Sequence, residues 1–261
     1  MPIQKTEALV ISRRDFRETS LIANFYTRDF GKLSGILKGI RNDPRKFAST
    51  LEPFSHSEII FYRSRTSSLH LVSQCDTKDN FSPVRADILK IGLGNLMMEL
   101  LDAVMPPEDK NEEIFDLAVA SLKELSASAN PEKIMTIFKI KVLSLSGFRP
   151  HFDSCVSCNA KIYTQSKFSL SLGGLLCPQC FHKDIKARSI FRGTVASILY
   201  IEQNDFPANL KLGMNPQIKK ELGLILNAFL NFHLEKEFKA QKVLDKIENF
   251  KLGDTLPMIS N

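Results

Sequence analysis

The stretch LIANFYTRDFGKLSGIL, residues 21–37, decides the fold class of the first part of the chain. Its first six residues are mostly β-branched, aromatic or aliphatic, which is typical of a strand. Asp29-Phe30-Gly31-Lys32 then supplies a turn, and residues 33–38 resume a two-residue alternation with both faces partly apolar. The stretch therefore predicts two strands joined by a tight turn.

Strand-like runs flank this hairpin on both sides. Residues 8–11 are a compact apolar run, and residues 57–62 and 69–73 form a hairpin pair around a polar loop. Five strands in about 75 residues is the number found in a small Greek-key barrel of the oligonucleotide-binding (OB) type. An SH3-like barrel has the same periodicity, so the pattern alone leaves both open. We interpret residues 1–80 as an OB-fold nucleic-acid-binding domain.

The hydrophobic period becomes helical after residue 80. Ser82 and Pro83 are a start signal, and the apolar pattern from Ile88 to Val104 stops at Pro106-Pro107. Two further helices are predicted over residues 114–125 and, after Pro131, over 134–145. We interpret residues 81–150 as the first part of a helical domain.

More helices are predicted towards the C-terminus. Residues 193–202 have a helical pattern, and Pro216 begins a helix with one apolar face. That face consists of Ile218, Leu222, Ile225, Leu226, Phe229 and Leu230. A last pattern over residues 238–250 extends or follows this helix. We interpret residues 191–252 as the second part of the helical domain and residues 253–261 as a flexible tail.

Four of the five cysteines form two Cys-x-x-Cys pairs, Cys155/Cys158 and Cys177/Cys180, with 18 residues between the pairs. This spacing is typical of a zinc site. Each short turn aims two sulfurs at one ion, so two turns complete a tetrahedral shell with no position left for water. We expect one structural Zn²⁺ in a module of residues 151–190, with a strand over 162–172 and a Gly173-Gly174 turn. The predicted fold class is α+β and multidomain: an N-terminal OB-type barrel, then an all-helical domain carrying an embedded four-cysteine zinc module.

Disulfides and a redox role are the alternatives for the paired cysteines. Paired thiols in a reducing compartment are more often metal ligands than disulfides, and a redox site needs only one such pair. His182, beside the second pair, is interpreted as a surface residue rather than a ligand, and Cys75 as a buried strand residue. The N-terminus has no secretory signal pattern, and no run of about 18 uninterrupted apolar residues occurs. We therefore expect a cytoplasmic protein without membrane contact.

Positive charge gathers near the predicted N-terminal barrel. The net charge is +6, which is compatible with a polyanionic partner. Six cations between residues 28 and 46 are opposed only by Asp29 and Asp43, and we predict them as DNA contacts: Arg28, Lys32, Lys38, Arg41, Arg45 and Lys46. A merely solvated charged surface is the alternative. The aromatic rings available for base stacking, each of which can instead belong to the core, are Phe25, Tyr26, Phe30 and Phe47.

Several short segments resemble the bacterial RecO recombination mediator family. They are EALVI (7–11), ETS (18–20), GKLSG (31–35), KGIR (38–41), LEPF (51–54), IFYR (60–63) and LSGFRP (145–150), the last lying directly ahead of the cysteine pairs. The resemblance implies an OB barrel, a helical domain and an embedded zinc module. It also implies a role in recombinational repair: binding of single- and double-stranded DNA, annealing of complementary strands, and recombinase loading with the RecR protein and the single-strand-binding protein. By position, Lys38 and Arg41 fall in the family's basic loop.

We therefore expect a DNA-binding recombination mediator that is not an enzyme and has no small-molecule substrate. A zinc-containing scaffold that recruits proteins, with incidental DNA binding, is the alternative, and a DNA-processing enzyme is a third. A nuclease needs clustered carboxylates for metal ions, but the densest acidic cluster lies in a Pro-led loop and is expected to be solvated: Glu108, Asp109, Glu112 and Glu113. A helicase needs a Gly-x-x-x-x-Gly-Lys-Ser/Thr string, and the sequence contains none.

Overall fold

The computed structural model of the chain describes residues 2–40 and 51–253, without the side chains of 248–253. The described parts of 1–131 and 238–261 form one compact unit, and residues 132–237 form a second. The domain boundaries at residues 80, 150, 190 and 252 were placed from sequence motifs. We propose that they separate smaller modules within these two units. No described helix combines the length and apolar content that a membrane crossing requires.

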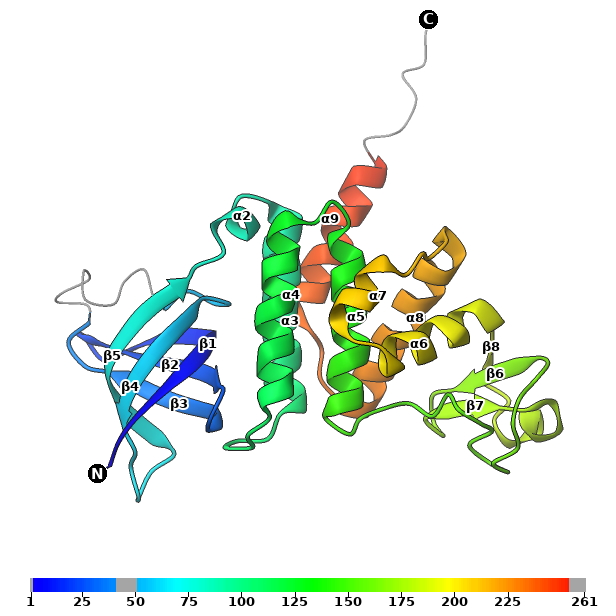
Figure 1. Cartoon of the computed structure of the whole chain (residues 1–261), viewed down its shortest axis with the longest axis horizontal. Coiled ribbons are helices and arrows are strands. Elements are labelled where there is room, and N and C mark those ends of the chain that lie inside the picture. The colour runs from blue at the N-terminus through cyan, green and yellow to red at the C-terminus, as the bar shows by residue number, and fades with distance from the viewer. Residues whose placement is uncertain (1, 41–50, 254–261) are drawn as a thin grey trace, which may run out of the picture. The chain divides into compact units, whose positions relative to one another are not determined.

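The first unit begins with a closed barrel of five strands (Figure 1). The strands are β1 (Ile3–Phe16), β2 (Ser20–Thr27), β3 (Gly31–Leu37), β4 (His56–Tyr62) and β5 (Leu69–Asp79). Their neighbour order is β1-β2-β3-β5-β4, and β1 also pairs with β4 to close the barrel, while β3 and β5 run parallel. The barrel is of the OB type, which confirms the predicted fold class.

Strand alternation fills the barrel with the apolar residues that the sequence pattern singled out. Leu21, Ala23 and Phe25 of β2 belong to the core. Leu33 and Leu37 of β3 pack with them. Of the aromatic residues considered for stacking, Phe25 and Tyr26 are fully buried and Phe30 packs against the core, whereas Phe47 lies outside the described residues. Cys75, in β5, is 1% exposed and is buried as predicted.

The helix expected to begin at Ser82-Pro83 begins later. Ser82–Arg85 form only the short α2, and α3 (Ile88–Val104) is a separate helix. The carboxylate of Asp87 caps α3 by accepting hydrogen bonds from the N–H groups of Leu89 and Lys90, which fixes the start at this residue. Ile88, expected on the apolar face, is 67% exposed because it lies in the first turn, ahead of the buried stretch that starts at Gly92. The end of α3 before Pro106-Pro107 is as predicted.

Two further helices complete the first unit. α4 (Glu112–Ala127) follows α3 along the chain, and α9 (Lys239–Gly253) packs against α3 (Figure 1). A Cβ atom added to Gly92 would lie 2.6 Å from Cδ2 of Leu244, so glycine permits the close approach of the two helices.

The second unit combines helices with a small sheet. It contains α5 (Pro131–Leu145), β6 (Ser166–Ser169), β7 (Gly174–Leu176), the 3₁₀ helix η1 (Pro178–Lys183), β8 (Arg188–Ile190), α6 (Arg192–Gln203), α7 (Phe206–Lys211) and α8 (Pro216–Leu234). The strand order is β7-β6-β8. The sequence pattern did not predict α7. Pro216 begins α8 as predicted, and α9 follows it as a separate helix because Glu235 takes a left-handed conformation at the end of α8.

The strand predicted over residues 162–172 is much shorter in the structure. Only Ser166–Ser169 are extended as β6. The chain then turns, with the hydroxyl of Ser169 accepting a hydrogen bond from the N–H of Leu172 and the N–H of Gly173 donating to the carbonyl of Leu170. Gly173 has φ +68, the left-handed conformation that the predicted glycine turn requires.

Candidate metal centre and candidate nucleic-acid interface

The four predicted metal ligands lie together in the second unit. The Sγ atoms of Cys155, Cys158, Cys177 and Cys180 are all within 4.8 Å of one another, and those of Cys158 and Cys177 are 3.7 Å apart. Four sulfurs at about 2.3 Å from a tetrahedral zinc ion are about 3.8 Å apart. All four thiols are free rather than joined in disulfides. Their spacing therefore fits a four-thiolate metal site.

Backbone hydrogen bonds shape the turn of each cysteine pair. The N–H of Cys155 donates to the carbonyl of Ala160 (2.9 Å), and the carbonyl of Cys155 accepts from the N–H of Asn159 (2.8 Å), which is left-handed at φ 58. In the second pair, the N–H of Cys180 donates to the carbonyl of Cys177 (2.9 Å) as η1 begins. Each turn folds back within a few residues, which brings its two sulfurs together.

The surroundings of the sulfurs shift two of the thiol pKa values in opposite directions. Burial is the largest effect on Cys155 and raises its pKa, but N–H groups of Cys177, Cys158 and Ser157 outweigh burial and lower the pKa to about 6. The N–H of Cys177 lies 3.4 Å from Sγ of Cys155. Burial raises the pKa of Cys180 to about 12. Donors aimed at a sulfur favour the thiolate, which is the form that ligates metals.

Burial and donor chemistry fit an ion with a structural role. Cys155, Cys177 and Cys180 pack in a small apolar cluster with Leu176 and Ala187, and Cys158 is exposed. A shell of four thiolates has no open position for a substrate or a reactive water. His182 is exposed and is not part of the ligand group found among the described residues.

Three of the six predicted DNA contacts, Arg41, Arg45 and Lys46, lie outside the described residues. Lys38 directly follows β3 and is exposed. Leu37, the last residue of β3, is fully buried, and Lys38 lies in the turn that follows it. No described carboxylate forms an ion pair with Lys38. As far as residues 2–40 and 51–253 are concerned, its charge is therefore available to a polyanion.

Carboxylates of the first unit hold Arg28 and Lys32. Nη2 of Arg28 lies 3.0 Å from Oδ2 of Asp116, and its Nε lies 3.6 Å from Oε2 of Glu112. Nζ of Lys32 donates to the carbonyl of Asp102 at 2.7 Å, lies 3.2 Å from Oδ1 of the same residue, and has a side chain only 19% exposed. A phosphate would have to displace these partners, and DNA contact by Arg28 and Lys32 stays a prediction.

The loop between α3 and α4 is docked on the barrel. The N–H of Glu108 donates to the carbonyl of Lys32 (2.9 Å), and the hydroxyl of Tyr26 donates to the carbonyl of Asn111 (3.2 Å). A Cβ atom added to Gly31 would lie 2.2 Å from the carbonyl oxygen of Asp109. The β2–β3 turn and this loop are therefore in direct backbone contact.

The acidic cluster of the loop is exposed, as predicted, at Glu108, Asp109, Glu112 and Glu113, and two of these residues also form ion pairs. Glu108 pairs with Arg63 of the barrel, and Glu112 pairs with both Arg28 and Lys110. These ion pairs form because the loop crosses the barrel at a place where basic side chains are exposed.

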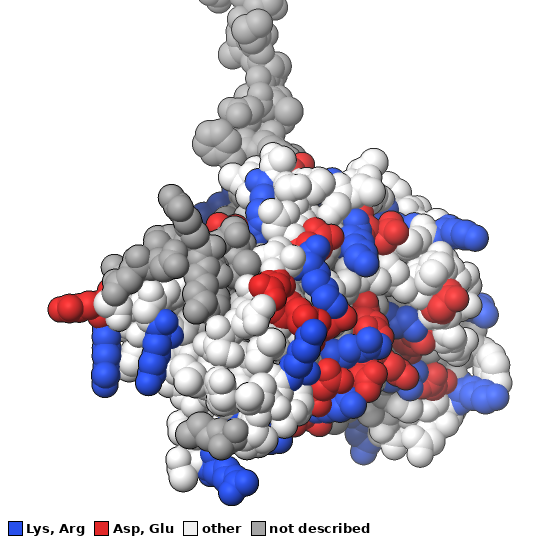
Figure 2. Space-filling model, turned by 60° about the vertical axis from the view of Figure 1, so that its left-hand side comes forward, with Lys and Arg blue, Asp and Glu red and all other residues white. Residues whose placement is uncertain are grey.

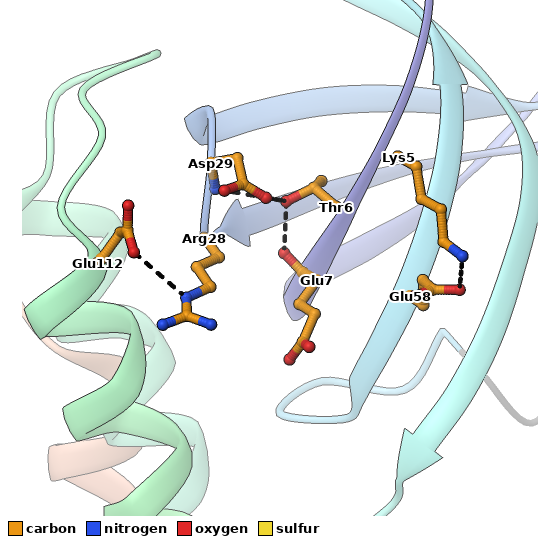
Figure 3. A pocket seen from close by; sticks show the side chains of 7 residues that line it. All are labelled: Lys5, Thr6, Glu7, Arg28, Asp29, Glu58 and Glu112. Carbon is orange, nitrogen blue, oxygen red and sulfur yellow. Dashed lines mark hydrogen bonds and ion pairs between the residues drawn. The ribbon is translucent and has the colours of Figure 1, made fainter.

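A polar pocket of about 380 Å³ lies beside this contact (Figure 3). Its lining consists of Lys5, Thr6, Glu7, Arg28, Asp29, Glu58 and Glu112. In Figure 3, Lys5 reaches Glu58 and Arg28 points towards Glu112. Four carboxylates against two cations give the lining excess negative charge, which repels a phosphate backbone. This pocket is therefore no site for DNA.

The face drawn in Figure 2 carries mixed charge. Acidic and basic groups lie side by side over much of it. Ion pairs of opposite sign also occur on the barrel, where Lys5 lies 2.8 Å from Glu58 and Glu7 pairs with Lys78. A surface of alternating sign does not concentrate a polyanion as a single-sign surface does.

The opposite end of the β2–β3 hairpin carries arginines that were not predicted as DNA contacts. The register pairs Phe16 with Ser20 and Leu21 with Leu37, so the β1–β2 turn and Lys38 lie at the same end of the barrel. Three exposed arginines flank or occupy that turn: Arg13, Arg14 and Arg17. The run Arg13-Arg14-Asp15-Phe16-Arg17 is the sequence pattern that could have predicted this second basic cluster. This end of the barrel is the candidate nucleic-acid interface.

Two family models match the chain. The model described as Recombination protein O N terminal matches residues 1–81, and the one described as Recombination protein O C terminal matches residues 85–242. Similar proteins named DNA repair protein RecO occur in Syntrophus aciditrophicus (29% identical over 254 residues, 95% of this chain and 97% of that protein) and in Dehalococcoides mccartyi (30% over 249 residues, 95% and 97%). A third, from Alkaliphilus metalliredigens, is 29% identical over 245 residues, 93% of this chain and 99% of that protein.

Proposed function

The chain belongs to the recombination protein O family, a family of DNA repair proteins, and we propose that it acts in recombinational repair by binding and annealing DNA without catalysing a reaction. The observation that carries the proposal is the OB-type barrel with Arg13, Arg14 and Lys38 exposed at one end. Both single- and double-stranded DNA present the phosphates that such cations bind.

Annealing by this protein needs no reactive group. Two DNA strands repel each other, and a cationic surface that holds both lowers the repulsion, releases counterions and raises their local concentration. The four-thiolate site supports this view because its closed shell suits a structural ion rather than catalysis.

The barrel assignment is tested by removing two charges, Lys38→Gln with Arg41→Gln. We expect weaker binding of single-stranded DNA of every sequence, and a slope of log affinity against log salt that is shallower by about 1.4, because each lost phosphate contact accounts for about 0.7. The matched control is Lys5→Gln with Lys110→Gln, which removes the same charge from the carboxylate-rich side and should leave the slope unchanged. Fluorescence anisotropy across a salt series measures both. An unchanged slope in the first variant would contradict the assignment.

An annealing assay separates this function from the two alternatives. Complementary strands should pair faster with the protein than without it. Pairing no faster than the spontaneous rate would favour a zinc-containing scaffold that recruits proteins. Cleavage or unwinding of labelled DNA in Mg²⁺ or Mn²⁺, with or without ATP, would instead indicate a DNA-processing enzyme.

We also propose that the protein loads recombinase together with a RecR-type protein and the single-strand-binding protein, as membership of the family suggests. Strand pairing and recombinase loading on templates coated with single-strand-binding protein, with and without the RecR-type protein, test this directly. If neither partner changes the outcome on coated templates, the partnership is wrong.

Cys155, Cys158, Cys177 and Cys180 are proposed to hold one structural Zn²⁺, which would tie the two cysteine turns together. Metal analysis under reducing conditions should find about one zinc per chain. A protein that is folded and free of zinc would end the assignment. Reduced thiols also suit a reducing compartment, and we propose a cytoplasmic protein that associates with the nucleoid during repair.

A further inference from the structure

The segment around the cysteine site is strongly basic. Residues 151–192 contain two acidic residues, Asp153 and Asp184, and six basic ones: Lys161, Lys167, Lys183, Lys186, Arg188 and Arg192. All six basic side chains are at least partly exposed. The proposed function makes no use of them.

Both carboxylates of the segment already have partners. Asp153 pairs with Arg149 at 2.7 Å. Asp184 accepts hydrogen bonds from the hydroxyl groups of Ser169 (2.6 Å) and Ser171 (3.1 Å) and from the N–H of Lys186 (2.8 Å), and these bonds, led by that of Ser169, lower its pKa. No ion pair joins any of the six basic side chains to a carboxylate among the described residues. The charge of Lys186 also lowers the pKa of Asp184, and the other five charges have no carboxylate partner among the described residues.

The fold brings part of this charge onto one surface together with aromatic rings. Lys167 of β6 is opposite Ser189 of β8 and Leu176 of β7, so these three share one face of the small sheet. Nζ of Lys167 lies 4.8 Å from the ring centre of Phe181 in η1, which ends at Lys183. Tyr163, between Lys161 and Lys167 in sequence, is 71% exposed.

We propose that this surface binds the phosphate backbone of a second DNA strand while the barrel holds the first. The surface is called the basic face and consists of Lys167 and the exposed side chains of Lys161, Tyr163, Lys183 and Lys186, whereas Arg188, which pairs with Phe168, lies on the other face of the sheet. Cations with an exposed aromatic ring are what single-strand surfaces without sequence preference use: phosphates meet the cations and a base stacks on the ring. An acidic protein would also meet the charge, but the exposed Tyr163 favours a nucleic acid. The inference rests on DNA binding by the barrel.

The first experiment counts the strands that one protein holds. Two oligonucleotides of identical, non-complementary sequence carry a donor and an acceptor dye, and energy transfer between them reports binding of both. The test variant is Lys161→Gln with Lys183→Gln and Lys186→Gln. The matched control is Lys211→Gln with Lys219→Gln and Lys220→Gln, which removes three exposed cations from helices of the same unit.

We expect the test variant to lose energy transfer, whereas the control keeps it. For total DNA binding, the test variant should have a salt slope shallower by about 2, so a fourfold rise in salt would cost it about 20-fold less affinity than the wild type. Bound zinc and circular dichroism, equal in the two variants, establish that the fold is intact.

A second experiment locates the strand directly. A photo-crosslinking p-benzoylphenylalanine in place of Tyr163 should attach to labelled DNA, and the same group in place of Tyr200, which is 40% exposed in the same unit, should not. If the test variant keeps full energy transfer, or position 163 does not crosslink, the basic face does not bind DNA and this proposal is wrong. DNA binding by the barrel would be unaffected by that result. A wild-type protein that binds no oligonucleotide at all would instead overturn the proposed function.

Discussion

His70 is a buried barrel residue whose surroundings disfavour protonation of its ring, although Oε1 of Glu108 lies 3.9 Å from its Nε2 and opposes this effect. It is 2% exposed, and its Nδ1 atom accepts a hydrogen bond from the N–H of Ser64 (3.2 Å). An acceptor nitrogen carries no proton, so protonation would set two N–H groups against each other. Burial, the largest effect, lowers the pKa of His70 below its ordinary value of 6.5. The folded protein therefore binds a proton less readily than the unfolded chain.

The sign of the resulting pH dependence follows from linkage. As pH falls through about 6.5, His70 is protonated in the unfolded chain but not yet in the folded protein. The free energy of unfolding therefore decreases until the pH reaches the lowered pKa of His70 in the folded protein. His70→Asn keeps an acceptor near the N–H of Ser64 and does not titrate. We expect its melting temperature to fall less than that of the wild type between pH 7.5 and 5.5. Parallel curves for the two proteins would show that His70 does not contribute.

At the scale of elements, the contact between the β2–β3 turn and the α3–α4 loop depends on Gly31. Gly31 has φ +64 and no room for a Cβ atom beside Asp109. Gly31→Ala adds a left-handed alanine and a backbone clash, and we expect a loss of about 2–5 kcal/mol in the free energy of unfolding. Gly39→Ala is the matched control, because Gly39 has φ +72 but no described atom within 4 Å of the added Cβ. Its expected cost is about 1–2 kcal/mol.

Urea denaturation of the two glycine variants measures the difference directly. A similar loss in both would mean that backbone conformation alone matters and that the loop shifts away at no cost. A larger loss for Gly31→Ala would establish that loop docking stabilises the first unit.

Sequence patterns predicted elements well where the signal is local. The strand-like composition of residues 21–26 predicted β2, and alternation in residues 33–38 predicted β3. The spacing of Cys155, Cys158, Cys177 and Cys180 predicted their cluster. Boundaries were less accurate, because a single capping residue such as Asp87, or a hydroxyl such as that of Ser169, decides where an element begins or ends.

Long-range partners were beyond the reach of sequence patterns. Arg28 and Lys32 belong to a basic cluster by sequence, yet their carboxylate partners, Asp116 and Asp102, come 88 and 70 residues later. The clustering of basic residues in the sequence therefore overstated the positive charge that Arg28 and Lys32 can offer to DNA. The arginines beside the β1–β2 turn became candidates only once the strand register brought that turn to the same end as Lys38.

At the scale of the whole molecule, the metal site and the barrel belong to different compact units. All four clustered cysteines lie within residues 132–237, whereas Cys75 lies in the barrel of the first unit. A four-thiolate site generally forms only with its metal, so metal binding energy is folding energy for the segment that supplies the ligands. Loss of zinc should therefore affect the two units unequally.

Cys177→Ser tests this inequality. We expect the variant to lose bound zinc and the amide groups of residues 151–190 to exchange with deuterium much faster, while residues 3–27 of the barrel stay protected and DNA is still bound weakly. Cys75→Ser makes the same chemical change in the other unit, and it should keep zinc and destabilise the barrel by about 1–3 kcal/mol, because it buries a hydroxyl in an apolar core. Mass spectrometry of exchange together with zinc analysis measures both. If the barrel amides also exchange faster when zinc is lost, the two units do not fold independently. If the amides of residues 151–190 stay protected from exchange after zinc is lost, apolar packing rather than the metal holds the cysteine turns.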